Sequence, residues 1–296
     1  MFKELVLVAC SGGLDSSATL CILQKSGFIN ILPVHYTYGH RGQDSEILAI
    51  KKVCKDLNLP LKIFDLENIY NEMEVTKISM LANKNATIVT GTNFGLKSVS
   101  AWHPGRNLLF MTIMMTLAEA EIMKYNYDTV YFSGGWMQLT ESSTYPDNTP
   151  YFTDACLKAG QYGTLVGDRF KILYCLSNLM KAEQFTLIKH FGLESIYSHT
   201  ISCDRPKVID GVPHNCMKDG IPACGSGLLS YWGSKMVGMN DMELRNFYEV
   251  DDPSYEAFIP EHLKQNFTKS PDINDIINRI LLPEDKLENL RKLIKK

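Results

Sequence analysis

The stretch Leu5-Val6-Leu7-Val8-Ala9-Cys10-Ser11-Gly12-Gly13-Leu14-Asp15-Ser16-Ser17 decides the fold of this chain. Its first five residues form an apolar run with the length and composition of a buried parallel strand. A glycine pair follows, and a helical pattern then runs from Ala18 to Lys25. A strand, a glycine turn and a helix in this order bring backbone N–H groups and a helix N-terminus together on one anion.

The turn itself is rich in hydrogen-bond donors. Gly12 and Gly13 let the backbone approach a phosphate closely. Ser11, Ser16 and Ser17 add hydroxyl groups, and Ser16 or Ser17 is expected to cap the helix. A glycine pair alone would indicate no more than a well-capped strand-to-helix turn. The loop also lacks the lysine and the spacing of a Walker A motif.

Strand and helix patterns alternate along the chain. Further strands are predicted at Ile29–Tyr36, Leu61–Leu66, Tyr127–Ser133 and Phe170–Leu173. Helices are predicted at Asp44–Leu57, from about 103 to Met123, from about Tyr151, at Met180–Phe191, at Ile273–Leu281 and at Glu284–Lys295, whereas residues 67–101 show no regular pattern. Such alternation predicts an α/β fold, a doubly wound parallel sheet with helices on both faces. Because ligands of these sheets bind beyond the carboxyl ends of the strands, the loops at Ser11 and Tyr38 should face one crevice.

The composition is that of an ordinary globular protein. Of 296 residues, 45% are hydrophobic and 21% charged, and the formal net charge is −3, so no strong field favours nucleic acid or a membrane as partner. No signal peptide or run of about 18 apolar residues is found. Eight cysteines are too few for a disulfide scaffold of this length, which predicts a reducing cytoplasm.

Five motifs carry a resemblance to a known family. They are Ser11–Ser16 (SGGLDS), Tyr38-Gly39-His40-Arg41, Pro104-Gly105-Arg106-Asn107, Tyr145-Pro146-Asp147 and Lys181-Ala182-Glu183. The first resembles the PP-loop of the N-type ATP pyrophosphatases. All five, in this order over residues 1 to about 235, resemble 7-cyano-7-deazaguanine synthase, although the second matches the family's YGQRH only in part. The resemblance implies an adenine nucleotide alpha hydrolase-like fold.

The resemblance assigns roles to named residues. ATP binding is expected at Ser11, Gly12, Gly13, Leu14, Asp15, Ser16, Ser17, Tyr38, Arg41, Gly105 and Arg106. Catalytic roles are expected for Asp15, Arg106 and Lys181, with Asp15 binding Mg²⁺, and substrate binding for Tyr145, Asp147 and Phe152. The residues alone leave alternatives: Arg106 neutralises a phosphate or is merely exposed, Asp147 reads a purine-like ring or only forms a turn, and Lys181 contacts ATP or is solvated.

The cysteines depart from the family pattern. The family binds structural zinc with one upstream cysteine and a CGxCxxC motif, but here Gly227 and Ser230 occupy the last two cysteine positions. A tetrahedral zinc site of Cys203, His214, Cys216 and Cys224 is one interpretation. The other is a lost site with three free thiols. Either way, residues 205–223 form a candidate specificity element.

The predicted function is ATP-dependent adenylation of 7-carboxy-7-deazaguanine, with release of pyrophosphate and attack by ammonia to give an amide or, after a second round, a nitrile. Two alternatives stay open: a related ligase that joins the carboxylate to an amine or a protein, and a non-catalytic nucleotide-binding module. We expect a homodimer. The predicted divisions are a PP-loop core over 1–200, a cysteine-containing region over 201–240 and a helical extension over 241–296.

Overall fold

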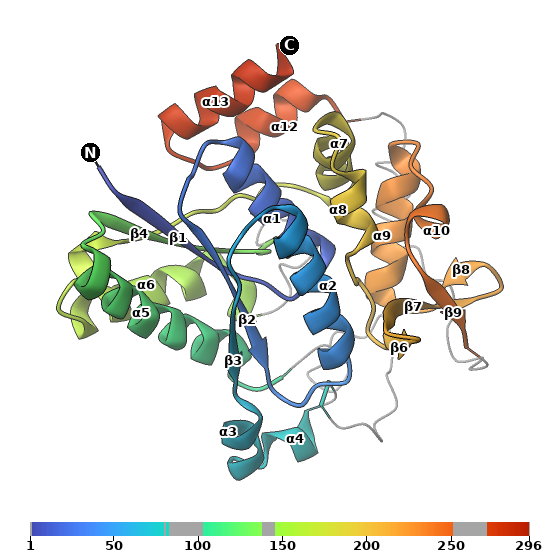
Figure 1. Cartoon of the computed structure of the whole chain (residues 1–296), viewed down its shortest axis with the longest axis horizontal. Coiled ribbons are helices and arrows are strands. Elements are labelled where there is room, and N and C mark those ends of the chain that lie inside the picture. The colour runs from blue at the N-terminus through green and yellow to red at the C-terminus, as the bar shows by residue number, and fades with distance from the viewer. Residues whose placement is uncertain (1, 80, 83–102, 138–145, 251–270, 296) are drawn as a thin grey trace.

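A five-stranded parallel sheet forms the centre of the molecule (Figure 1). The computed structural model describes residues 2–79, 81–82, 103–137, 146–250 and 271–295. The strand order is β3-β2-β1-β4-β5, with β1 at Glu4–Ala9, β2 at Ile31–Thr37, β3 at Lys62–Asp65, β4 at Thr129–Gly134 and β5 at Phe170–Ile172. The chain winds outward from β1 to β3 and then returns to the other side of β1 at β4. A topological switch point therefore lies between the carboxyl ends of β1 and β4.

Side chains of β1 alternate between the two faces of the sheet. Val6 and Val8 belong to the core cluster beneath α1 (Leu14–Lys25) and α2 (Gln43–Asp56). Leu5 and Leu7 belong to the cluster beneath α5 (Arg106–Tyr125) and α6 (Pro150–Gly163). The two layers of helices lie on opposite sides of the sheet in Figure 1. The prediction of a doubly wound α/β fold is confirmed, and the apolar run is buried on both faces for this reason.

Short elements complete this half of the chain. They are α3 (Glu67–Glu72), α4 (Val75–Ile78), the 3-10 turns η1 (Pro146–Asn148) and η2 (Gly167–Arg169), α7 (Lys181–His190) and α8 (Glu194–Ser198). The predicted helix bounds agree with the structure to within a few residues, except that α1 begins at Leu14, four residues before the predicted start. None of the described helices is both long enough and apolar enough to cross a membrane.

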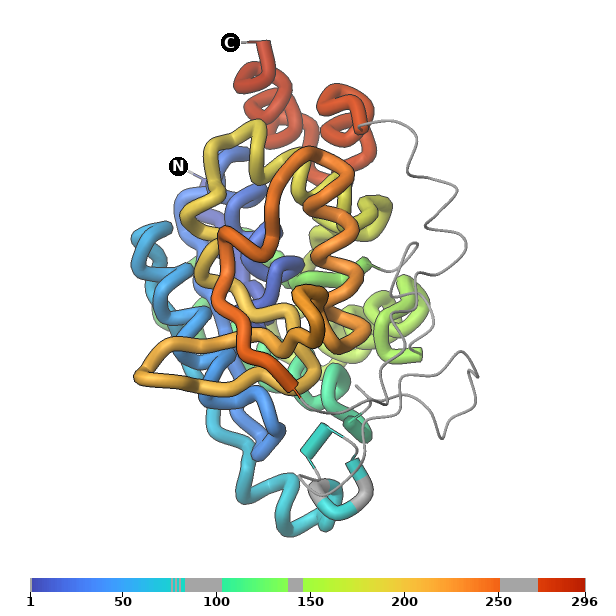
Figure 2. Tube along the Cα trace, turned by 90° about the vertical axis from the view of Figure 1, so that its right-hand side faces the viewer, coloured from blue at the N-terminus to red at the C-terminus, as the bar shows by residue number. Residues whose placement is uncertain are grey.

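A second, smaller sheet contains Cys216, and Cys203 and Cys224 lie just before and just after its first three strands. It contains β6 (Lys207–Ile209), β7 (Val212–Lys218), β8 (Ile221–Pro222) and β9 (Phe247–Glu249). Two helices, α9 (Gly225–Met236) and α10 (Asp241–Leu244), lie between β8 and β9 in the chain. β7 pairs antiparallel with β6 and β8 and parallel with β9. Figure 2 shows these elements together on one side of the molecule.

The last two helices close one end of the main core. α12 (Ile273–Arg279) and α13 (Glu284–Ile294) lie beside α1 and α7 at the top of Figure 1. Their buried side chains join the same cluster as Val6 and Val8; these are Ile276, Ile277, Ile280, Leu287 and Leu290. Each such side chain stabilises the fold by roughly 1.5–3 kcal/mol. The extension therefore packs on the sheet, and the predicted division at 241 stays a prediction.

Candidate active site

The glycine turn after β1 is held tightly against α2. Gly12 has φ +83° and is buried, and a Cβ atom there would lie 2.7 Å from the carbonyl oxygen of Glu46. Only glycine fits this position without moving α2. Gly12 O also accepts a hydrogen bond of 3.0 Å from Ile201 N, and Ser11, which is exposed, accepts one from Gly13 N at 3.2 Å. The glycine turn therefore lies against α2, the helix that follows β2, and the shared crevice of the loops after β1 and β2 stays a prediction.

The start of α1 differs from the prediction. Gly13 is the N-cap residue, and no side chain of the loop caps the helix. Ser16 Oγ instead donates to Gly13 O at 3.2 Å, and Ser17 Oγ is buried without a partner in the described part of the chain. The prediction that Ser16 or Ser17 caps α1 is wrong, because the helix begins before both residues. Leu14 packs its side chain in the core.

A residue far along the chain takes part in this helix start. Ser202 Oγ accepts a hydrogen bond of 3.3 Å from Leu14 N. It thereby satisfies one of the N–H groups that have no partner inside the helix. Sequence analysis missed Ser202, because nothing in the pattern around it indicates a contact 188 residues away.

The loop after β4 reaches the same helix start. A Cβ atom on Gly135 would lie 2.7 Å from Asp15 Cβ and 2.9 Å from Ser16 N. The absence of a side chain there lets the backbones of both loops meet at the switch point. Thr19 Oγ1 joins them further by donating to Gly134 O at 3.2 Å. This edge of the sheet therefore presents the first turn of α1 between two glycine-containing loops.

Lys181 and Asp15 form an ion pair beside the loop. The Lys181 ammonium donates to Asp15 Oδ1, and the side chains are 10% and 29% exposed. Lys181 is the first residue of α7, and α9 packs closely behind it, since a Cβ on Gly233 would lie 3.0 Å from Lys181 Cβ. Both residues were predicted to be catalytic from separate motifs, and the fold brings them together. The lysine is largely buried and not freely solvated.

Three of the other predicted residues, Tyr38, Arg106 and Asp147, gather at the start of α5. Arg106 Nη1 donates to the Tyr38 hydroxyl at 3.3 Å, and Asn107 Nδ2 donates to the backbone oxygen of Asp147 at 3.0 Å. Burial raises the pKa of the Asp147 carboxyl above its ordinary value, while the Arg106 charge opposes that rise. The arginine, tyrosine and aspartate predicted from three motifs therefore lie around one point.

Three predicted residues have other surroundings. Phe152, near the start of α6, packs against the core cluster beneath α5. Arg41 N donates to Leu81 O at 3.2 Å. Gly105 is the N-cap of α5, with φ +65° and no neighbour within 4 Å of a Cβ atom placed on it. Tyr145 lies outside the described residues.

Two histidines that received no role lie beside Tyr38. The His40 ring stacks on the Tyr38 ring with centroids 4.1 Å apart, and His40 Nε2 lies 3.1 Å from Glu46 Oε2. Burial, the Arg106 charge and His40 lower the pKa of His103 to about 4. His103 is therefore neutral at pH 7. Its Nδ1 lies 2.7 Å from Ser79 Oγ.

The three cysteines of the second sheet converge. The sulfur atoms of Cys203, Cys216 and Cys224 all lie within 4.8 Å of one another. Cys203 Sγ accepts hydrogen bonds from Cys216 N at 3.2 Å and Arg205 N at 3.4 Å. Cys224 Sγ accepts from two further backbone N–H groups, each at 3.4 Å. Backbone donors directed at sulfur stabilise thiolates, which are the form that binds a metal.

His214 lies outside this group of sulfur atoms. Its Nδ1 lies 2.8 Å from Val212 O. His214 and Cys216 point to the same face of β7, but residues two apart in a strand are separated by roughly 6.6 Å. The predicted set of four ligands is therefore reduced to three cysteines among the described residues. Three thiolates fit zinc in a site whose fourth position is taken by another group.

The protonation of the sulfur atoms is shared. Hydrogen bonds from Cys203 and Cys224 lower the pKa of Cys216, with burial opposing them. Burial raises the pKa of Cys203 well above its ordinary value. The hydrogen bonds within the cluster therefore favour the thiolate form of Cys216. All eight cysteines of the chain are free.

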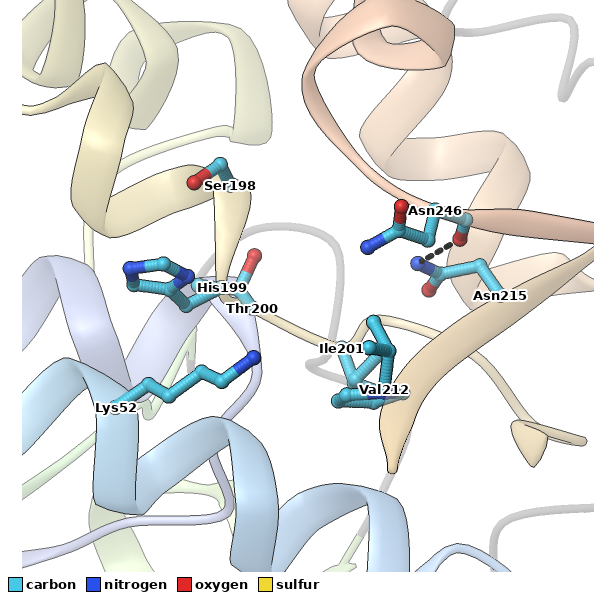
Figure 3. A pocket seen from close by; sticks show the side chains of 9 residues that line it. Lys52, Ser198, His199, Thr200, Ile201, Val212, Asn215 and Asn246 are labelled. Atoms are coloured by element: carbon cyan, nitrogen blue, oxygen red, sulfur yellow. Dashed lines mark hydrogen bonds between the residues drawn. The ribbon is translucent and has the colours of Figure 1, made fainter. Parts of the chain in front are cut away.

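A small cavity adjoins the segment that holds the glycine turn (Figure 3). Lys52 of α2 extends into it from one side, and Asn215 of β7 lines the other. Asn215 Oδ1 accepts from Ser202 N at 3.3 Å, and its Nδ2 donates to Asn246 O at 3.2 Å. Ile201 lines the cavity and also binds Gly12 O. Since neither Asp15 nor Lys181 lines it, the cavity is separate from the ion pair.

Comparisons with known proteins place the chain. The family model described as "Queuosine biosynthesis protein QueC" matches residues 5–226. A protein of Sulfurisphaera tokodaii named 7-cyano-7-deazaguanine synthase 2 is 29% identical over 80% of this chain and 46% of its own length. Proteins named 7-cyano-7-deazaguanine synthase are 29% identical in Pyrococcus horikoshii, over 71% of this chain and 86% of theirs, and 28% identical in Leptospira biflexa, over 82% and 94%.

The extent of these matches sets what they establish. The chain spans less than half the length of the Sulfurisphaera protein. It covers most of the Pyrococcus and Leptospira proteins. The family match covers well over half of the 296 residues and includes the glycine turn, the ion pair and all three motifs that supply Tyr38, Arg106 and Asp147. The chain therefore belongs to the QueC family of queuosine biosynthesis proteins.

Proposed function

We propose that this chain adenylates the carboxylate of 7-carboxy-7-deazaguanine at the expense of ATP and then transfers the acyl group to ammonia. The proposal depends on one observation, the Lys181–Asp15 ion pair beside the N-terminus of α1 at the topological switch point. A helix N-terminus with a neighbouring lysine is suited to a bound polyphosphate. Relatives that bear the name 7-cyano-7-deazaguanine synthase support the choice of acid.

Formation of the amide takes two steps. An oxygen of the substrate carboxylate attacks the α-phosphorus of ATP, and pyrophosphate leaves. Ammonia then attacks the carboxyl carbon, loses a proton, and displaces AMP to leave an amide. A second ATP then adenylates the amide oxygen with release of pyrophosphate, and loss of both protons from the nitrogen and of AMP gives the nitrile. The loop amides and Lys181 stabilise the charge that moves onto pyrophosphate.

The division of the site follows its geometry. The glycine turn and Lys181 serve the phosphates, whereas Tyr38, Arg106 and Asp147 lie together at the start of α5. In this arrangement Asp147 accepts hydrogen bonds from the N–H edge of the deazaguanine ring. Asp15 is 29% exposed, so its carboxylate is also suited to a Mg²⁺ ion that neutralises the phosphates.

The cysteine cluster is a structural site in this proposal. Cys203, Cys216 and Cys224 bind one zinc ion, which supplies folding energy and no reaction step. Cys203 directly follows Ser202, which binds the start of α1. The metal thus fixes one wall of the crevice.

The test is a single incubation with 7-carboxy-7-deazaguanine, ATP, Mg²⁺ and ammonium, analysed by mass spectrometry and by pyrophosphate release. We expect ATP-dependent formation of the amide or nitrile together with pyrophosphate. Product from a primary amine or a peptide, with none from ammonium, would instead identify the chain as a ligase that joins the carboxylate to an amine or a protein. No pyrophosphate with any acid would contradict the proposal.

A further inference from the structure

An arginine outside the family match contacts the helix that carries Lys181. Arg279 is the last residue of α12, and the match ends at residue 226. Its Nη2 pairs with Glu183 Oε1, and its Nη1 donates to Asn178 O at 3.0 Å. The guanidinium thus joins the loop before α7 to the first turn of α7.

Glu183 makes a second contact that orients this turn. Its Oε2 accepts a hydrogen bond of 2.8 Å from Met180 N, the N-cap residue of α7. A Glu at this position that returns to the N-cap N–H fixes the geometry of the helix start. The residue between them, Lys181, carries the ammonium that pairs with Asp15. The direction of Lys181 therefore depends on Glu183, and the direction of Glu183 depends on Arg279.

Arg279 is itself anchored. Ile276, Ile277 and Ile280 are almost fully buried in the core cluster of the main sheet. Leu281 forms a β-bridge with Tyr174, seven residues before Lys181. Asn178 Nδ2 also donates to Arg279 O at 3.5 Å. Both views place α12 beside α7 (Figures 1 and 2). The C-terminal helices thus hold the arginine on the same framework as the active site.

We propose that Arg279 is a positioning residue for Lys181, so that the C-terminal helix pair forms part of the catalytic structure. The Glu183 side chain is only 11% exposed, and a largely buried carboxylate that loses its partner becomes unstable in that position. Without Arg279 the Glu183 carboxylate turns toward water, the helix start loosens, and the ammonium leaves Asp15. The proposal rests on the proposed function for what Lys181 does, but not for where it lies.

The decisive measurement is the reactivity of the Lys181 amine in the full-length chain. An acylating reagent modifies only the neutral, accessible amine, and peptide mass spectrometry gives the rate at this one lysine. We expect Arg279→Gln to raise the rate of labelling at Lys181 by roughly fivefold or more, because the Arg279–Glu183 ion pair that orients the start of α7 is lost. Arg279→Lys keeps a charge beside Glu183 and should restore most of the protection. Thermal unfolding of each variant reports whether the fold is kept.

Arg291 offers a matched control. It lies on α13 and pairs with Glu284 at 2.5 Å, away from α7. Arg291→Gln removes an arginine of similar exposure and should leave the labelling of Lys181 unchanged. If Arg291→Gln raises the labelling as much as Arg279→Gln does, general loosening of the helix pair is the cause and the proposal is wrong.

Turnover provides a second readout. We expect Arg279→Gln to lower kcat for pyrophosphate release roughly tenfold, with KM for ATP changed less than twofold, since misplacing one group affects the transition state most. Wild-type labelling of Lys181 in a folded Arg279→Gln protein overturns the proposal, whatever the activity. If Arg279→Gln does not fold, Glu183→Gln decides by the same labelling, because it keeps the cap to Met180 and loses the ion pair. If the wild type releases no pyrophosphate, the proposed function fails while the labelling still tests the positioning.

Discussion

The Lys181 ammonium and the Asp15 carboxylate pair across 166 residues of sequence and join the first turns of two helices. One helix follows β1 directly, and the other is the first helix after β5. The pair therefore joins the first and the last of the five family motifs beside the glycine turn. An ion pair at this position holds a cation ready beside an anion-binding helix start and keeps it from binding elsewhere.

Replacing the acidic partner tests this arrangement. Asp15→Asn keeps the size of the side chain and a hydrogen-bond acceptor for Lys181, so the fold should be kept. It removes the charge that orients the ammonium and attracts Mg²⁺. We expect pyrophosphate release to fall by roughly 10²-fold, the scale of one lost electrostatic group. Asp44→Asn, an exposed change in the first turn of α2, serves as control. Wild-type rates in Asp15→Asn would contradict the role.

The cysteine cluster makes a prediction about metal content. Elemental analysis of the chain purified without added metal should give about one zinc per chain. Cys216→Ser should lose most of it, because one of three thiolates is removed. His214→Asn should keep it, since His214 lies outside the group of sulfur atoms. Chelation should lower Tm by several degrees. Loss of zinc in His214→Asn would restore the histidine to the site, and a metal-free wild type would leave three thiols.

Much of the fold was predictable because its signals are local. The apolar run at β1 and the 3.6-residue periodicity of α2 and α5 each follow from the next few residues. The parallel sheet followed from the alternation of strands and helices, whereas the strand order, and with it the switch point, is seen only in the structure. The motifs also placed Asp15, Lys181 and Arg106 at predicted strand ends or helix starts. In the structure these are the positions from which side chains reach the crevice.

What the sequence could not reveal depends on long-range contacts. Ser202 binds the start of α1 from 188 residues away, and Arg279 reaches Glu183 from 96 residues away. No local pattern marks either residue. The expectation for His214 depended on its short spacing from Cys216, but the extended strand β7 separates the two residues by roughly 6.6 Å, and His214 lies outside the group of sulfur atoms.

His103, which is buried beside Tyr38, predicts a dependence of stability on pH. Burial, Arg106 and His40 place the pKa of His103 at about 4 in the folded chain, against 6.5 ordinarily. Because the unfolded chain binds this proton more tightly, protonation of His103 favours unfolding. The contribution of neutral His103 to the free energy of unfolding is complete above about pH 6.5 and is lost as the pH falls toward 4. The loss is at most about 3 kcal/mol.

Urea unfolding between pH 7.5 and 4.5 measures this term by comparison with His103→Asn. The variant keeps a partner for Ser79 Oγ, which lies 2.7 Å from His103 Nδ1, but it cannot titrate. We expect the free energy of unfolding of the wild type to fall more steeply with decreasing pH than that of the variant. Parallel curves would show that His103 is protonated as easily in the folded chain as in the unfolded one.

The last prediction separates recognition of the acid from handling of the phosphates. Asp147 and Arg106 lie together at the start of α5, whereas Lys181 lies beside the glycine turn. A site built to accept hydrogen bonds from a ring edge leaves those donors unpaired when the acceptor is removed. Asp147→Ala should therefore lower kcat/KM for 7-carboxy-7-deazaguanine by roughly 10²-fold, on the scale of a charged hydrogen bond, with KM for ATP nearly unchanged.

Lys181→Ala should give the opposite division, with slow adenylation and a nearly unchanged KM for the acid, because its ammonium acts on charge that develops at the phosphates. Asp168→Ala, an exposed change in η2, controls for loss of an aspartate alone. Steady-state kinetics with each substrate varied in turn distinguishes the two variants. Equal losses of ATP binding in both would show that the two residues act on one ligand. An unchanged kcat/KM in Asp147→Ala would show that the activated acid is recognised by other residues, and the choice of a deazaguanine would then lose its structural support.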